Sequence, residues 1–89
     1  MNAIITVVGG DRVGIIAKVS AFLADRNINI EDISQTVLSG NFVMMMMVDL
    51  TASAKPLAEV KTELAALGAT MEVSISLMHE RVFSAMHRI

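Results

Sequence analysis

The spacing of hydrophobic residues changes along the chain from a strand pattern to a helix pattern and back. Residues 3–8 are largely β-branched and almost continuously apolar, and Gly9-Gly10 follows them, which predicts a central strand covered on both faces. Over residues 12–26 the apolar positions recur at helical spacing, with charged residues on the other side. This pattern predicts a helix with Asp11 as its N-cap and Asn27 at its C-terminal end.

The middle of the chain predicts a hairpin. Residues 28–38 form a strand whose apolar residues change face near Glu31-Asp32, which indicates a β-bulge. Ser39-Gly40-Asn41 is a turn signal, and residues 42–50 form the second strand of the hairpin. This second strand is rich in methionine and does not alternate, so we expect both of its faces to be covered.

The last third of the chain predicts a helix, a strand and a short helix. Pro56 suits the first turn of the helix, Ser53 is a candidate cap, and Gly68 is the expected C-terminal glycine. Residues 71–77 alternate cleanly between apolar and polar, as an edge strand does. Residues 79–89 place apolar side chains on one side of a short C-terminal helix.

The order of these elements restricts the fold. Right-handed crossovers in a βαββαβ chain give a four-stranded antiparallel sheet of order 4-1-3-2 with both helices on one face. The sequence therefore predicts an α+β, ferredoxin-like sandwich, with residues 1–89 as a single domain and residues 78–89 as a C-terminal helical extension. We expect the other sheet face to be covered by the C-terminal helix, by a partner subunit, or by both.

Composition favours a small cytoplasmic protein that self-associates. Hydrophobic residues make up 54% of the 89 residues, more apolar surface than so short a chain can bury alone. The longest apolar run, residues 42–48, is too short for a membrane helix, and the N-terminus lacks the basic start of a signal peptide. With no cysteine and a net charge of −2, the chain predicts no disulfide, no thiolate metal site and no nucleic-acid partner.

Catalytic and metal chemistry find little support in the sequence. The fold also serves metal chaperones and RNA-binding modules, but the paired cysteines and strand aromatics that these need are absent. Acylphosphatase-like hydrolysis stays open as an alternative because Arg12 follows two glycines. His79, Glu80 and His87 are weak candidates for metal ligands, since histidines so placed are more often surface groups. We therefore expect no enzyme activity, no metal site and no cofactor.

The most distinctive segment is Gly9-Gly10-Asp11-Arg12-Val13-Gly14-Ile15, between the first strand and the first helix. A turn of this kind presents free N–H groups and the positive end of a helix dipole, which suit a carboxylate or another small anion. Gly14 has no Cβ, so a ligand or a partner backbone can approach closely. The alternative is that the glycines only shape a tight connection and that Asp11 only caps the helix.

With residues 10–15 before the helix and Asn27-Ile28-Asn29-Ile30 after it, the sequence resembles the ACT-domain family over essentially its whole length. It is especially similar to small free-standing ACT proteins, and also to the ACT repeats of the glycine cleavage system transcriptional repressor. The resemblance implies a regulatory βαββαβ module that binds an amino acid. It also implies side-by-side dimers with an eight-stranded sheet and ligand sites at the interface.

The resemblance assigns ligand contacts to one loop and to the second strand of a neighbouring subunit. By position these residues are Asp11, Arg12, Val13, Gly14 and Ile15 in the loop, and Asn29 and Ile30 in the partner's strand. Some family members carry asparagine and proline where this chain has Asp11 and Val13. Asp11 would repel a ligand carboxylate beside it but could pair with an ammonium group.

These observations lead to one expected function and one alternative. We expect a non-catalytic, regulatory homodimer that binds an amino acid or similar small metabolite and passes the signal to an unidentified protein partner by an allosteric shift. The alternative is a structural or protein-interaction module without a small ligand, in which the C-terminal helix and the open sheet face dock a partner.

Overall fold

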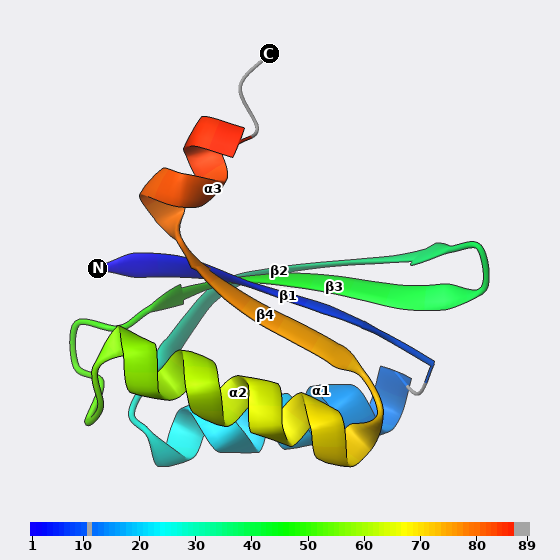
Figure 1. The fold of residues 1–89 in the computed structure, drawn as a ribbon, viewed down its shortest axis with the longest axis horizontal. Coiled ribbons are helices and arrows are strands. Elements are labelled where there is room, and N and C mark those ends of the chain that lie inside the picture. The colour runs from blue at the N-terminus through cyan, green and yellow to red at the C-terminus, as the bar shows by residue number, and fades with distance from the viewer. Residues whose placement is uncertain (11, 87–89) are drawn as a thin grey trace.

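A computed structural model describes residues 1–10 and 12–86 of the chain (Figure 1). The order of elements is the predicted βαββαβ with a further helix. The elements are β1 (Asn2–Gly9), α1 (Arg12–Asp25), β2 (Asn29–Leu38), β3 (Asn41–Asp49), α2 (Leu57–Met71), β4 (Ser74–His79) and α3 (Glu80–Met86).

The four strands form one antiparallel sheet in the order β2-β3-β1-β4, which is the predicted order read from the other edge. Helices α1 and α2 lie side by side on one face of this sheet, and α3 rises on the other side from the end of β4 (Figure 1). The two strands with the most apolar residues, β1 and β3, are the central pair, as their patterns predict.

The core lies between the sheet and the two long helices. On β1 the residues facing the helices are Ala3, Ile5 and Val7, all completely buried. Their partners on β3 are Val48, Met46 and Met44, which are buried to the same degree. The flexible methionine side chains fill the sheet centre against the helix residues Ile15, Val19, Leu23, Val60 and Leu64.

The predicted irregularities of the hairpin are confirmed. The pairing of β2 with β3 shifts between Ile30 and Asp32, so Glu31 is the extra residue of a bulge. Ser39 and Gly40 form a two-residue turn with positive φ angles of 52° and 79°. Two successive left-handed residues match the twist of the strands they join, as in a type I′ hairpin.

Two predictions about α2 were wrong. Gly68 does not end this helix, which continues to Met71 and closes with Glu72 in the left-handed region at φ 57°. Gly68 is buried instead, because a Cβ there would lie 2.8 Å from the carbonyl oxygen of Val73. Ser53 caps no helix; its hydroxyl bonds to the backbone of Lys55.

Other predictions concern the residues at the ends of the helices. Asn27 adopts the left-handed conformation expected after α1, with φ at 59°, and its side-chain amide donates to the carbonyl of Ala52 at 3.0 Å. Pro56 stands at the N-cap of α2 without a side-chain cap bond. The predicted cap Asp11 and the last three residues of the predicted C-terminal helix, 87–89, lie outside the described residues.

A polar cluster joins the two long helices at one end. Arg26 Nε donates to Glu63 Oε1 at 2.8 Å, and Lys55 Nζ donates to Glu63 Oε2 at 2.6 Å. The Arg26 guanidinium also lies 3.5 Å from the centre of the Phe22 ring. The hydrogen bond from Arg26, then that from Lys55, hold the pKa of the Glu63 carboxyl below its ordinary value.

No helix among the described residues, α1, α2 or α3, has the length and apolar content to cross a membrane.

Candidate ligand-binding site

The loop that joins β1 to α1 is held against the sheet by tight packing. A Cβ on Gly9 would lie 2.3 Å from Val73 Cγ1 and 2.9 Å from Ile15 Cδ1. Ile15 is 1% exposed and belongs to the core, so its side chain anchors the start of α1 to the sheet. Val13, in contrast, is 76% exposed, and Gly14 between them is half-buried. The start of α1 is therefore anchored to the sheet and presents one solvent-facing apolar side chain, that of Val13.

A cavity of about 400 Å³ borders this loop. Its walls come from the β1–α1 loop and α1 on one side and from the end of α2 on the other: Gly10, Gly14, Ile15, Lys18, Thr70, Met71, Glu72 and Val73. This volume falls within the range of pockets that hold small metabolites. Lys18 and Glu72 carry opposite charges and belong to no ion pair among the described residues. Two such groups are suited to the carboxylate and the ammonium of a small zwitterion.

The structure places the two predicted parts of the site at opposite ends of the sheet. Gly9, which leads into the loop, pairs with Phe42 at one end. At the opposite end of the sheet, Asp49 on β3 pairs with Asn2 on one side and with Asn29 on the other. The seven residue steps between Asn2 and Gly9 correspond to about 23 Å along a strand. Within one chain, Asn29 and the loop therefore do not meet.

Asn29 and Ile30 lie on β2, an edge strand with an unpaired side. Asn29 is exposed, and Ile30 is half-buried against the core. From Glu31 to Leu38 every residue of β2 is exposed, and this part of the edge carries no lysine, arginine or proline. A long edge strand without such residues is open to pairing with another strand.

The direction of β2 decides what such pairing would do. β2 runs parallel to β1, because both are antiparallel to β3, so Asn29 lies at the starting end of β1 and Leu38 at the loop end. A second copy of β2 paired antiparallel to the first runs the opposite way. Its Asn29 then lies at the end of the sheet that carries this chain's β1–α1 loop.

Of the seven predicted site residues, Val13, Gly14 and Ile15 lie together in the first turn of α1, where the backbone of Arg12 begins the helix. Asp11 lies outside the described residues. The sequence reasoning missed Lys18 and Glu72. Lys18 is one turn beyond Gly14 on α1 and could have been inferred, whereas Glu72 reaches the cavity only because α2 extends past Gly68.

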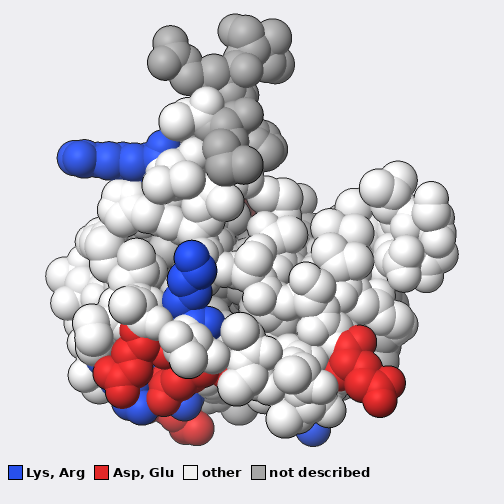
Figure 2. Space-filling view, in the orientation of Figure 1, with Lys and Arg blue, Asp and Glu red and all other residues white. Residues whose placement is uncertain are grey.

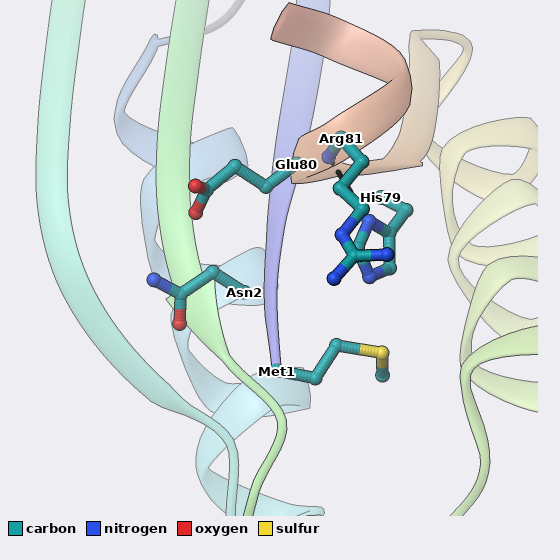
Figure 3. A pocket seen from close by; sticks show the side chains of 5 residues that line it. All are labelled: Met1, Asn2, His79, Glu80 and Arg81. Carbon is teal, nitrogen blue, oxygen red and sulfur yellow. Dashed lines mark hydrogen bonds between the residues drawn. The ribbon is translucent and has the colours of Figure 1, made fainter.

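A second, more open hollow of about 590 Å³ lies where the chain starts and α3 begins (Figure 3). In this view the Arg81 side chain lies alongside the His79 ring, while Asn2 and Glu80 lie on the other side of β1. His79 Nδ1 accepts the backbone N–H of Arg81 at 3.0 Å. The terminal ammonium of Met1 is held by the Thr51 hydroxyl at 3.0 Å and by Asp49 at 3.5 Å.

Neither region contains a metal-binding cluster. Within residues 1–10 and 12–86, no group of three or more His, Asp or Glu side chains is placed to share an ion. Asp49 has a pKa below its ordinary value chiefly because Thr51 donates its hydroxyl and its backbone N–H to that carboxylate.

Comparison with known proteins identifies the family. The sequence model of the ACT domain matches residues 2–78. The chain belongs to the ACT domain family. A UPF0237 protein of Listeria innocua is 49% identical over 89 residues, which is 100% of both chains. A UPF0237 protein of Methanopyrus kandleri is 46% identical over 88 residues, covering 99% of this chain and 98% of that protein.

Solved ACT structures have the same fold. An ACT domain protein from Streptococcus pneumoniae superimposes with a TM-score of 0.82 at 42% identity, covering 93% of each chain. A structure assigned to a glycine cleavage system transcriptional repressor has a TM-score of 0.75 at 23% identity, covering 85% of this chain and 44% of that one. At that identity the second likeness shows the fold alone. ACT domains generally bind small-molecule ligands in regulation.

Proposed function

We propose that this ACT protein is a non-catalytic, cytoplasmic sensor: a homodimer that binds an amino acid or a similar small metabolite at its subunit interface. The observation that carries the proposal is the separation of the loop from Asn29 within one chain, together with the direction of β2. Antiparallel pairing of two β2 edges makes one eight-stranded sheet and places each loop at the same end as the partner's Asn29.

The charges beside the loop support a zwitterionic ligand. Lys18 and Glu72 border the cavity next to Gly10 and Gly14, and no described residue neutralises either of them. The partner's Asn29 adds an amide that can both donate and accept hydrogen bonds. Arg12 and Asp11 are the remaining loop residues assigned to the ligand. A free-standing sensor acts through differential affinity, so its output is a changed affinity for a protein partner.

The first experiment is thermal unfolding in the presence of each of the twenty amino acids at millimolar concentration. A ligand at about 100 times its dissociation constant stabilises by about 2.7 kcal/mol, which raises the Tm of a domain this small by several degrees. We expect a shift with one amino acid or a few related ones, and its loss in Gly14→Val and Asn29→Ala. The absence of a shift with all twenty would contradict the choice of an amino acid.

Dimerisation through β2 has its own test. Ile33 and Val37 are 40% and 66% exposed on this edge strand, so lysine at both positions is compatible with the fold. Lysines facing their copies across an antiparallel pair repel one another. We expect Ile33→Lys/Val37→Lys to lose the edge contact in sedimentation equilibrium, and the double variant to lose any ligand response as well.

A protein-interaction module without a small ligand is the second candidate. The observation that favours it is the uncharged hairpin formed by β2 and β3: residues 33–48 contain no charged side chain. Figure 2 shows this part of the molecule, which projects on the right, in white, with the charged groups mostly gathered below it over the helices. An unchanged Tm with every amino acid, together with a stable complex with another protein, would favour this candidate.

A further inference from the structure

The sheet face opposite α1 and α2 is here called the open face, and its side chains form rows that run across the four strands. The strand register gives it three central rows: Met78–Ile4–Met47–Asp32, Ser76–Thr6–Met45–Ser34 and Ser74–Val8–Val43–Thr36. Asp32, at the β2 edge, is the one charged residue in these rows. These three rows are otherwise uncharged and contain three methionines, which suits contact with protein. Asp49, in the next row with Asn2, already pairs with the Met1 ammonium.

A groove lies within the first two rows, with Met45 and Met47 as its main apolar side chains. Ile4 is 6% exposed, yet it is the one buried hydrophobic residue among those described that lies outside the core. Its side chain lies on the open face, on the strand β1 that α3 also contacts. A cavity of about 170 Å³ lies beside it, with Met45 and Met47 next to Ile4 and with Asp32 and Ser34 from β2.

Helix α3 packs on the β1 and β4 side of the open face, beside the part of the groove that β3 and β2 form. Its main contacts are with β1 and β4, and it rises away from the sheet in Figure 1. β4 ends at His79 and α3 begins at Glu80, so the helix starts directly at the end of the strand. Val82 on α3 remains 50% exposed, and Arg81 is exposed without an ion pair among the described residues.

We propose that α3 of a second copy of this chain packs into the groove and that the exchange is reciprocal. Val82 of each copy then lies against Met45 and Met47 of the other, and Arg81 faces Asp32. The charges support a second copy as the occupant, since the helix carries an unpaired base and the groove an unpaired acid. The chain's own α3 lies against β1 and β4, so the Met45 and Met47 side of the groove is left for another helix.

The area of the face also favours exchange over simple stacking of two sheets. Three rows at a spacing of about 6.7 Å on four strands about 4.8 Å apart cover roughly 400 Å². A stable interface takes about 800 Å² from each partner, so the face alone is too small. Adding α3 to each side provides a second apolar contact per copy, and the two-fold relation doubles every contact. This contact uses the Asp32 side chain on the open face of β2, but neither the unpaired backbone of the β2 edge nor the ligand loop.

The test is sedimentation equilibrium of the full chain and its variants. Val82→Asp places a charge in the groove, and we expect it to raise the dissociation constant of this contact about tenfold or more. Met45→Glu alters the other side of the contact and is expected to have the same effect. The matched control is Ala66→Asp, an exposed position on α2, which should leave the assembly unchanged. Circular dichroism checks that each variant is folded.

A charge exchange tests the orientation. Arg81→Glu and Asp32→Arg should each weaken the association, and the double variant should restore it, because the pair forms again with reversed signs. With edge pairing also present, the wild type assembles as four copies and Val82→Asp leaves two. A dimer that Ile33→Lys/Val37→Lys dissociates and Val82→Asp does not would overturn this inference and leave the proposed function standing. A dimer that only Val82→Asp dissociates would support this inference and contradict the dimer of the proposed function. A monomeric wild type would overturn this inference and the proposed dimer alike.

Discussion

Gly68 lies so close to the backbone of Val73 that a Cβ on Gly68 would be 2.8 Å from the Val73 carbonyl oxygen. This approach brings α2 against β4. Gly68→Ala gains about 1 kcal/mol in helix propensity but forces backbone apart at a cost of about 1–3 kcal/mol. We expect a net loss of about 1 kcal/mol and a fall in Tm of about 5 °C by calorimetry.

Gly10→Ala is the matched control for that substitution. A Cβ on Gly10 would have no atom within 4 Å, and its φ is not in the left-handed region. We therefore expect Gly10→Ala to leave the Tm unchanged or slightly raised, because alanine reduces the entropy of the unfolded chain. An increase in Tm for Gly68→Ala would contradict the packing described for α2.

The hairpin turn offers a stabilising substitution. Ser39 has a positive φ of 52°, which asparagine tolerates better than serine. We expect Ser39→Asn to raise the free energy of unfolding by about 0.5 kcal/mol in urea titrations. Gly40→Ala, at φ 79°, should lower it by about 1 kcal/mol. Equal stability of the two variants would contradict a type I′ turn.

The Glu63 cluster predicts a dependence of stability on pH. Because hydrogen bonds from Arg26 and Lys55 lower the pKa of Glu63 below its ordinary value of 4.5, the folded state favours the charged form. The stabilisation is complete above the unfolded pKa and is lost as the pH falls through the folded one. We expect Glu63→Gln to lower the Tm at neutral pH and the difference to shrink as the pH falls below 4.5 and through the lowered pKa of Glu63. A difference that stays constant with pH would contradict the charged pairing.

Much of the fold followed from residue patterns because local physics determines it. The two-sided apolarity of β1 and β3 places them at the sheet centre, and the phase change near Glu31 marks the bulge. The end of α2 was mispredicted for a tertiary reason. Glycine suits a helix end, but Gly68 satisfies a contact with β4 that the local sequence does not reveal.

The candidate site could be predicted only in part. Residues 12–15 are neighbours in the chain, so one local pattern identifies them. The distance between Asn29 and this loop depends on sheet topology, and their joint use depends on a second copy. Lys18 and Glu72 meet at one cavity because α1 and α2 are packed side by side, and no sequence spacing records that.

The central claim is that each ligand site combines the loop of one chain with Asn29 of another, and mixing two inactive variants tests it most directly. Gly14→Val damages the loop and Asn29→Ala damages the partner strand, so each variant alone should fail to bind the amino acid found by thermal unfolding. In a mixed dimer one site carries both changes and the other carries neither. After equal amounts are unfolded and refolded together, calorimetric titration should recover about one quarter of the wild-type sites, since about half of the dimers are mixed. Recovery of no sites from a mixture shown to contain mixed dimers would contradict a shared site.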